Sequence, residues 1–242
     1  MKFRKNIAKI FPIVFDIQCI SQIFLRHKPQ PMQCPCCNTV QRFRLFGLPP
    51  RLNALCTNCN SLERHRFLRL FLIRNPELLS GADVLHFAPE ISTRKYLSKF
   101  AGSYVGCDLF PHGDVIKINI ESIDLPDSKF SLIMCSHVLE HVNDKPALKE
   151  MFRVLRPGGT ALLMFPIIEG WDNTYENPEI TSEADRLRYY GQEDHVRYFG
   201  RDARDRIKQA GFALSEYTAI EPDISTYGLL RGEKIFVASK PS

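Results

Sequence analysis

The sequence has no long uninterrupted apolar run, although 44% of its 242 residues are apolar. A helix that crosses a bilayer needs roughly 18 or more such residues in succession. The apolar stretch at residues 10–15 follows several lysines, as in a signal peptide, but Pro12 interrupts it, Asp16 ends it and no small-residue cleavage site follows. We therefore expect no transmembrane segment and a cytoplasmic location.

A large excess of one charge is also missing. The formal net charge is +5 and the isoelectric point is about 8.8. This mildly basic balance permits anionic partners without requiring nucleic acid. The chain is longer than an average domain, and its apolar residues suffice for a sizeable core, so we expect a globular protein.

The eight cysteines do not indicate disulfides, because the chain lacks a secretory signal. Four of them form the pattern C-x2-C-x18-C-x2-C, namely Cys34, Cys37, Cys56 and Cys59. Two such pairs can place four thiolates around a structural zinc ion. We predict a zinc ribbon at residues 34–60, with short strands at 40–48 and 52–55. Cys36 is either a spare thiol or a replacement for Cys34, and the alternative for the whole set is free buried thiols.

Residues 1–33 carry an amphipathic pattern beside several cations. The apolar positions near helical spacing are Ile7, Ile10, Phe11, Val14, Ile17 and Phe24. Such a helix can pack on the protein's own surface, or it can lie in a membrane interface with its lysines toward anionic headgroups. Both alternatives stay open, so peripheral membrane contact is one expectation.

A connecting helix is predicted at residues 61–81. It is expected to begin at Asn60, with Glu63 in the position of a capping box. Its apolar face would dock the ribbon onto the rest of the chain. Arg64, His65, Arg66 and Arg69 make the helix basic. We interpret them as a solvated face, with phosphate contact as the alternative.

From residue 82 onward, apolar strands alternate with helices, which predicts a mostly parallel sheet with covered faces. The expected strands are 83–87, 104–107, 114–118, 130–135 and 160–165, and the expected helices are 92–100, 144–154 and 201–210. The last two strands, 212–219 and 233–238, are expected to form an antiparallel edge pair. Residues 167–192 are predicted to be a long irregular insertion, functional or mobile.

Two segments of this region share one plan. Asp83-Val-Leu-His-Phe-Ala-Pro-Glu90 is a short strand that enters a tight turn, and Tyr104-Val-Gly-Cys-Asp108 is a strand that closes on a carboxylate. In dinucleotide-binding folds the first turn holds the ligand's polar backbone and the later acid binds ribose hydroxyls. The usual glycines are missing, since Ala88 and Glu90 stand in their places. The spacing supports a nucleotide site, the missing glycines do not, and the prediction therefore needs further motifs besides this loop.

Further motifs follow in a fixed order: Leu125-Pro-Asp-Ser-Lys-Phe130, His137-Val-Leu-Glu-His141 and Arg153-Val-Leu-Arg-Pro-Gly-Gly159. Together with the two strand segments, they resemble class I S-adenosylmethionine-dependent methyltransferases of the methyltransferase type 11 branch. The resemblance covers residues 82–242, apart from the last few. It implies an α/β fold, a Rossmann-like seven-stranded sheet with an antiparallel last strand, and S-adenosylmethionine as cofactor.

Carried over by position, the resemblance implies a set of cofactor-binding residues. The methionine end would lie against the turn formed by Phe87, Ala88, Pro89 and Glu90, the ribose hydroxyls on Asp108, and the adenine near Asn119 and Ile120. Leu109 and Ser136 complete the expected cofactor-binding set. The chain departs from the family at Ala88, Glu90, Asn119 and Ser131. The Asn119 carbonyl oxygen can still accept from an adenine amino group. The Glu90 carboxylate could pair with the cofactor's positive groups, or it could obstruct the site.

Methyl transfer from a sulfonium needs alignment, and a general base only if the acceptor must lose a proton. His137, His141 and His195 are the candidate catalytic residues, with packing as the alternative for each. Asp194 is a candidate partner that would orient His195. On a helix, His137, Glu140 and His141 would share one face and could chelate a transition metal. That set resembles the Glu-x-x-Glu-His metal site of ubiquinone-pathway O-methyltransferases and small-RNA 2′-O-methyltransferases, although metal-free relatives also exist.

The leading hypothesis is a methyltransferase that acts on an oxygen or nitrogen of a small molecule, such as a sugar or cell-surface precursor. One alternative is an RNA methyltransferase whose ribbon contacts nucleic acid. Another is a non-catalytic binding protein with a degenerate cofactor pocket. The expected organisation is an amphipathic segment at 1–33, the ribbon at 34–60, the connecting helix at 61–81 and the methyltransferase domain at 82–242.

Overall fold

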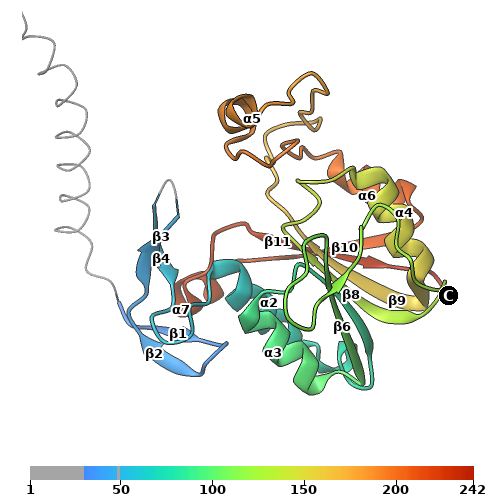
Figure 1. The fold of residues 1–242 in the computed structure, drawn as a ribbon. Helices are drawn as coiled ribbons and strands as arrows, with labels where there is room; N and C mark the ends of the chain where they lie inside the picture. The colour runs from blue at the N-terminus through green and yellow to red at the C-terminus, as the bar shows by residue number, and fades with distance from the viewer. Residues whose placement is uncertain (1–29, 48–49) are drawn as a thin grey trace, which may run out of the picture.

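A computed structural model of the chain describes residues 30–47 and 50–242. The predicted amphipathic segment, residues 1–33, lies almost entirely outside these residues. Figure 1 shows a small N-terminal unit of short strands beside a larger α/β unit, with α2 between them. No helix in the described ranges has the length and apolar composition that a bilayer span requires.

The larger unit is built on a seven-stranded sheet in the order β10-β11-β9-β8-β5-β6-β7. The pairs β5–β6, β6–β7, β5–β8 and β8–β9 are parallel, whereas β11 runs antiparallel to β9 and β10. This confirms the predicted fold class, including the antiparallel last strand. The strands are β5 (Asp83–Phe87), β6 (Ser103–Asp108), β7 (Ile116–Lys117), β8 (Phe130–Ser136), β9 (Leu155–Met164), β10 (Ala213–Thr218) and β11 (Lys234–Ser239).

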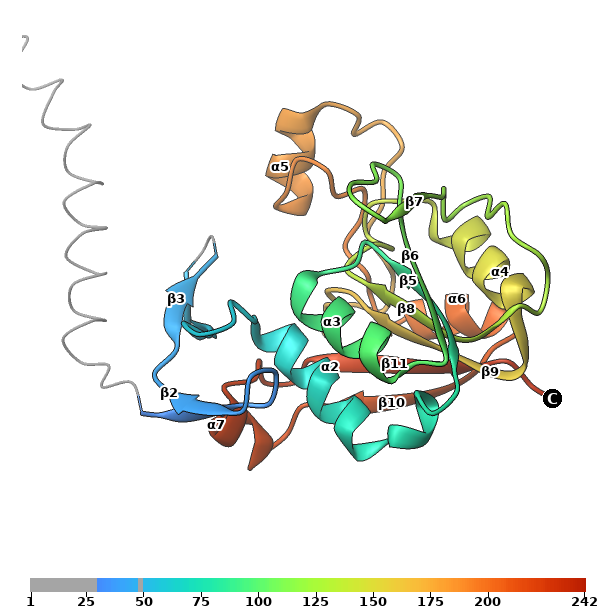
Figure 2. The same ribbon diagram turned by 60° about the horizontal axis from the view of Figure 1, so that its bottom comes forward.

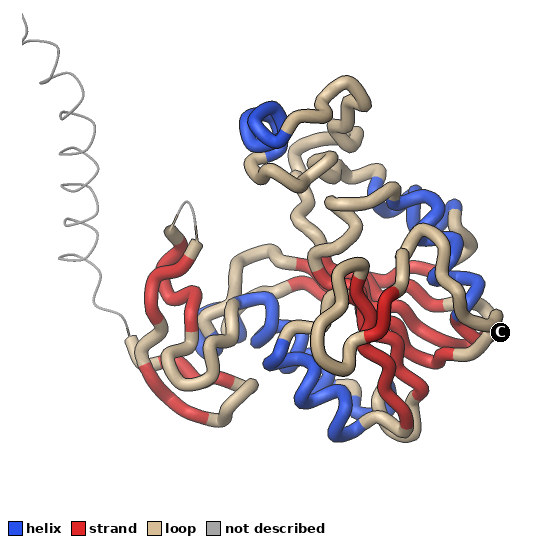
Figure 3. Tube along the Cα trace, in the orientation of Figure 1, coloured by secondary structure: helices blue, strands red, loops and turns tan. Residues whose placement is uncertain are grey.

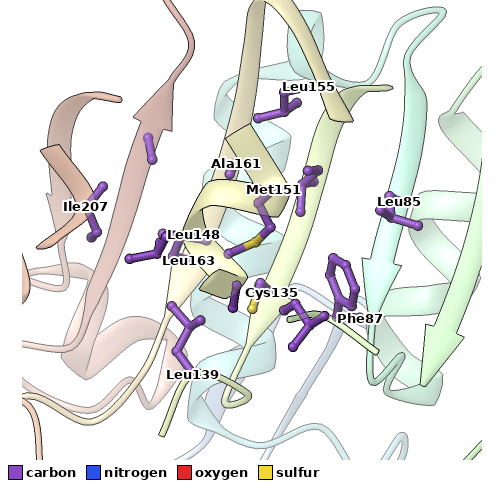
Figure 4. Close-up of a cluster of buried hydrophobic side chains, with 14 of the residues drawn as sticks. Leu85, Phe87, Cys135, Leu139, Leu148, Met151, Leu155, Ala161, Leu163 and Ile207 are labelled. Atoms are coloured by element: carbon purple, nitrogen blue, oxygen red, sulfur yellow. The ribbon is translucent and has the colours of Figure 1, made fainter. Parts of the chain in front are cut away.

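Helices cover both faces of the sheet (Figures 2 and 3). On one face α4 (Asp144–Val154) and α6 (Ala203–Gln209) pack on alternate strand residues, among them Leu85, Cys135 and Leu163 (Figure 4). On the other face α2 (Glu63–Arg74) and α3 (Ile91–Phe100) pack on the intervening residues, such as Val84 and Leu132. Successive side chains of a strand point to opposite faces, so burial on both faces requires the continuous apolar runs seen in the sequence.

Several predicted elements differ from the structure: for example, the strand predicted at 160–165 begins at Leu155, and the strand predicted at 40–48 is divided into Thr39–Gln41 and Arg44–Phe46. The helix predicted from Asn60 begins at Glu63, because Asn60 has φ +57° and cannot be helical. Glu63 forms an ion pair with Arg51 at 2.9 Å instead of closing a capping box, and the Leu62 amide donates to His65 Nδ1 at 3.1 Å. A short 3-10 helix, Pro76–Leu78, follows α2. The strand predicted at 114–118 is reduced to the two residues of β7.

The insertion at 167–192 is not wholly irregular, contrary to our prediction. It contains α5 (Glu183–Tyr190), which projects above the carboxyl-terminal edge of the sheet in Figure 1. Ser182 Oγ accepts from the Asp185 amide at 3.1 Å, and Gly191 ends the helix at φ +77°. Most of α5 is exposed, with Tyr190 buried, so its sequence lacks an apolar period. A second unpredicted helix, α7 (Asp223–Tyr227), connects β10 to β11.

The N-terminal unit consists of two antiparallel hairpins. β1 (Met32–Cys34) pairs with β2 (Thr39–Gln41), and β3 (Arg44–Phe46) pairs with β4 (Arg51–Leu55). α7 lies against β1, so the ribbon also contacts the carboxyl-terminal part of the chain. The ribbon is therefore held by two elements that are distant in sequence.

One buried side chain, Arg66 of α2, joins these parts. It has 0% exposure, and its five N–H donors all point at backbone carbonyl oxygens. The acceptors are Tyr227 (2.8 Å), Ala54 (2.9 Å), Ser61 (2.8 Å), Asn53 (3.0 Å) and Gly228 (2.6 Å). The guanidinium also lies 4.2 Å from the Phe43 ring centroid. The predicted solvated face of α2 is therefore wrong for Arg66, and also for the buried His65.

We expect Arg66→Met to lower the free energy of unfolding by about 3 kcal/mol or more, because it leaves buried carbonyl groups without donors. Chemical denaturation of the full chain measures this loss. The matched control is Arg42→Met, which removes an exposed cation from the ribbon and should change stability by less than about 0.5 kcal/mol. Equal stability of the two variants would contradict the role assigned to Arg66.

Candidate functional site

The carboxyl ends of β5, β6 and β8 meet at one edge of the sheet. Phe87 of β5 is in register with Cys107 of β6 on one side and with Cys135 of β8 on the other. In the sheet, β6 and β7 lie on one side of β5, whereas β8 and β9 lie on the other side. The chain therefore continues in opposite directions from β5, which makes the carboxyl ends of β5 and β8 a topological switch point. Open α/β sheets bind ligands in the crevice outside such a point. The turn after each of these strands therefore belongs to the candidate site.

Two non-glycine residues at this edge have left-handed backbone conformations. Ala88, after β5, has φ +46°, and its amide donates to the Cys107 carbonyl at 2.9 Å. His137, after β8, has φ +54°, and its amide donates to the Met164 carbonyl at 2.8 Å. Ala88 thus keeps the turn geometry for which glycine is the usual residue. Strained backbone of this kind gathers at binding and active sites.

Asp108 lies at the end of β6, beside that turn. Its Oδ1 accepts from the Phe110 amide at 2.9 Å, which orders the following loop. The side chains of Leu109 and Phe110 are exposed there. A half-buried acid at the end of the second strand is the arrangement that binds ribose hydroxyls in nucleotide-binding sheets.

The remaining sequence-predicted cofactor residues lie in different environments. Asn119 is exposed, and its Oδ1 accepts from the Glu121 amide at 3.0 Å. Ile120 is buried in the core with α4, and Ser136 is buried at the end of β8. The Asn119 carbonyl oxygen thus accepts one bond from its own loop, and its second lone pair is free in principle to accept from an adenine amino group.

Glu90, the last residue of the turn, is held by two side chains of α2. Arg64 Nη2 lies 2.7 Å from Oε1, and His65 Nε2 lies 2.6 Å from Oε2. Burial alone would raise the pKa of Glu90, but His65 and Arg64 outweigh it and hold this pKa at about 2. The sequence pattern did not reveal this contact, because it lies between residues of separate elements. It couples the turn after β5 to the helix that carries the ribbon.

The three candidate histidines gather around Glu140. His137 Nδ1 lies 3.1 Å from Glu140 Oε1, and the rings of His141 and His195 are 4.7 Å apart, edge to face. Residues 137–143 form a turn rather than a helix, so His137, Glu140 and His141 do not share the predicted helical face. The carboxylate of Asp194 lies 3.3 Å from His141 Nδ1. Asp194 is therefore a partner of His141 rather than the predicted partner of His195.

Two cavities flank this group of histidines. One of about 400 Å³ is lined by His137, Arg64, Phe165, Glu233 and Lys234, among others. A second cavity of about 600 Å³ is lined by His141, Glu176, Arg186 and Arg197 on the side of the insertion. Burial raises the pKa of Glu233 to about 7, against the opposing charge of His137. Sequence analysis missed Glu233, because nothing in the segment that precedes β11 distinguishes it from a surface glutamate.

The four predicted thiols form one compact cluster. The Sγ atoms of Cys34 and Cys59 are 3.7 Å apart, as are those of Cys37 and Cys56, and all four lie within 4.8 Å of one another. Ligands at about 2.3 Å from a tetrahedral zinc ion would be separated by about 3.8 Å. Cys36 is not one of the four clustered thiols; its Sγ lies beside Cys34 and donates to the His65 carbonyl at 3.6 Å. The described cysteines are all free of disulfides.

Polar groups surround the thiol cluster. Gln41 Nε2 lies 2.8 Å from Cys56 Sγ, and Ser61 Oγ lies 3.3 Å from Cys34 Sγ and 3.2 Å from Cys59 Sγ. Such donors stabilise thiolates and orient them toward a common centre. The donor set and its surroundings fit a closed four-sulfur metal site.

Comparison with known proteins identifies a matching family for part of the chain. Residues 91–163 match the family model described as a methyltransferase domain. The ubiquinone/menaquinone biosynthesis C-methyltransferase UbiE of Vibrio cholerae is 31% identical over 116 residues, which is 42% of this chain and 45% of that protein. The Escherichia coli UbiE is 31% identical over 118 residues, or 43% and 47%. The chain thus spans less than half the length of these curated relatives.

Solved structures share the fold at low sequence identity. The [4+2]-cyclase SpnF has a TM-score of 0.54 and 14% identity, over 73% of this chain and 81% of that one. The 1,6-didemethyltoxoflavin-N1-methyltransferase of Burkholderia thailandensis, solved with S-adenosylhomocysteine, has a TM-score of 0.51 and 16% identity, over 74% and 78%. At these identities the likeness shows the Rossmann-like methyltransferase fold.

We expect Glu90→Gln to destabilise the protein at neutral pH and not in strong acid. The pKa of Glu90 is lowered from an ordinary value of 4.5 to about 2, so its stabilisation is complete above 4.5 and is lost as the pH falls toward 2. The loss at pH 7 should be about 1.5–3 kcal/mol, the range for hydrogen bonds to charged groups. Urea denaturation across this pH range measures it. A difference between variant and wild type that stays constant with pH would exclude the ion pairs as its cause.

Proposed function

We propose that the protein is an S-adenosylmethionine-dependent methyltransferase. The observation that carries the proposal is the acid Asp108 at the end of β6, beside the switch point of a sheet with the methyltransferase strand order. The match of residues 91–163 to a methyltransferase domain supports it. When bound, the cofactor supplies an activated methyl group on a sulfonium sulfur.

The proposed cofactor-binding residues follow the three strand ends. The turn from Phe87 to Glu90 would hold the methionine end, Asp108 and Leu109 the ribose, and Asn119 with Ile120 the adenine, while Ser136 would face the cofactor from β8. The left-handed turn at Ala88 supports close approach of the ligand to the backbone. Because Glu90 is paired with Arg64 and His65, we assign it to the support of this turn rather than to the cofactor's ammonium.

The acceptor is proposed to be a small molecule that enters beside His137. The cavity of about 400 Å³ has the size of a small-molecule site. Its wall carries Arg51, Arg64 and Lys234 together with Glu63 and Glu233, so it suits a polar acceptor with a nucleophilic oxygen or nitrogen. A Glu233 pKa of about 7 makes that carboxylate a candidate to accept a proton from such a group.

One argument for an RNA acceptor, a basic exposed face on α2, does not hold. Of the basic residues of α2, Arg66 and His65 are buried, and Arg64 is paired with Glu90. These side chains are not an open phosphate-binding face. A small-molecule acceptor is therefore favoured over RNA. Separately, we propose a cytoplasmic location for the protein.

The thiol cluster is proposed to hold one structural zinc ion. Four sulfur ligands close the coordination sphere, so the metal would stabilise the ribbon and take no part in the transfer. The spacing of the Sγ atoms and the polar groups around them support this role. Through Arg66 and α2, the metal-bound ribbon would also keep Arg64 and His65 in place beside the cofactor turn.

We expect Asp108→Ala to weaken S-adenosylmethionine binding by about 1.5–3 kcal/mol, the cost of a lost hydrogen bond to a charged group. Isothermal titration calorimetry with the cofactor measures this change without knowledge of the acceptor. The matched control is Asp127→Ala, an acid before β8 at the opposite edge of the sheet. Failure of the wild type to bind the cofactor would overturn the proposed function and favour a non-catalytic binding protein.

We expect elemental analysis to find one zinc per chain bound by the ribbon. Cys56→Ser should release this metal and loosen the ribbon while the sheet, which has its own core, stays folded. The matched control is Cys36→Ser, because this neighbouring thiol is not one of the four clustered sulfurs. Full zinc content in the Cys56 variant, or zinc loss in the Cys36 variant, would show that the ligands are assigned wrongly.

A further inference from the structure

A second group of metal-ligating side chains lies outside the ribbon. The turn after β8 supplies Glu140 and His141, and His195 comes from the segment that follows the insertion. The Val196 amide donates to the Glu140 carbonyl at 2.9 Å, which holds the two segments together. One ligand atom from each of Glu140, His141 and His195 lies within 4.8 Å of the others. Three potential ligand atoms therefore form one compact group.

Glu140 and His195 are buried, and each has one side-chain atom without a hydrogen-bond partner in the described part of the chain. Glu140 is 1% exposed and its Oε2 makes no hydrogen bond; His195 is 4% exposed and its Nδ1 makes none. Buried polar atoms are almost always hydrogen-bonded, because an unpaired one loses its contact with water and gains nothing. Two such atoms in one cluster indicate a missing positively charged partner.

The second polar atoms of Glu140 and His141 are bonded in the manner of an outer ligand shell. His141 Nδ1 lies 3.2 Å from the Asp194 carbonyl and 3.3 Å from its carboxylate, which leaves Nε2 as the ligand atom. Glu140 Oε1 is bonded to His137 Nδ1 at 3.1 Å, which leaves Oε2. Metal-ligating histidines usually donate their second ring N–H to a carbonyl or carboxylate in this way.

We propose that Glu140, His141 and His195 bind a divalent transition metal ion. Two imidazoles and one carboxylate suit zinc, cobalt or iron better than magnesium or calcium, which prefer all-oxygen sites. Three protein ligands leave coordination positions open for water or an acceptor oxygen. The ligand set differs from the predicted one, because His137 orients Glu140 and His195 takes the third position. Any role in turnover rests on the proposed function, whereas the metal site itself does not.

The test uses the full chain with zinc in its ribbon and Co²⁺ as the probe. After mild chelation that spares the ribbon zinc, we expect Co²⁺ titration by calorimetry and visible absorption to show one further equivalent bound. Glu140→Gln and His195→Ala should each weaken this binding by at least about 100-fold, the upper end for loss of an outer-shell partner. His112→Ala, which changes an exposed histidine elsewhere, should bind as the wild type does.

Several outcomes would overturn the site. They are the absence of a further Co²⁺ equivalent in zinc-loaded wild type, wild-type affinity in the Glu140→Gln variant, or displacement of Co²⁺ by an equal concentration of Mg²⁺. Glu140→Gln keeps the shape of the side chain, so it decides the question even if His195→Ala lowers the melting temperature. Cofactor titration on the same samples separates the two proposals, because loss of metal binding with intact cofactor binding removes only the metal site.

Discussion

The arrangement of the described chain depends on one buried cation. Arg66 brings together the carbonyl oxygens of the ribbon, of the start of α2 and of the end of α7, with every N–H donor in use. A buried charge is tolerable only when its donors are fully satisfied, so these three segments must keep their relative positions. Lysine cannot replace this group, since it lacks the planar fork that reaches five acceptors.

The same helix connects the ribbon to the candidate cofactor site. One turn of α2 carries Arg66 toward the ribbon and Arg64 and His65 toward Glu90, so a displacement of the ribbon would also move the partners of the turn after β5. The ribbon therefore does more than add stability to the amino-terminal part. It fixes the position of a charged contact at the edge of the sheet where the cofactor is proposed to bind.

The acceptor side of the site is assembled from segments far apart in sequence. The turn after β8 provides His137, Glu140 and His141, while His195 arrives only after the insertion that contains α5. Arg197 links these segments, because its Nη1 donates to the Leu139 carbonyl at 2.8 Å and its Nε donates to Glu176 at 2.9 Å. The insertion is thus tied to the turn after β8 by buried polar contacts as well as by packing.

Much of the fold follows from local patterns in the sequence. Apolar runs such as that of β8 must lie between two layers, because both faces of the strand are buried, and the alternation of runs with helical segments leads to the parallel sheet. The spacing of Cys34, Cys37, Cys56 and Cys59 likewise indicated the thiol cluster. The polar helix α5 was not predicted, because a largely exposed helix does not require apolar residues at helical spacing.

Only the tertiary structure decided the partners of the charged residues. The sequence shows that α2 is basic, but not that Arg66 is buried or that Glu90 meets Arg64 and His65. It shows histidines at 137, 141 and 195, but not that Glu140 and His195 each keep a buried, unpaired atom. Hydrophobic burial has a period that can be followed along the chain, whereas ion pairs and ligand sets join residues whose separation in sequence follows no rule.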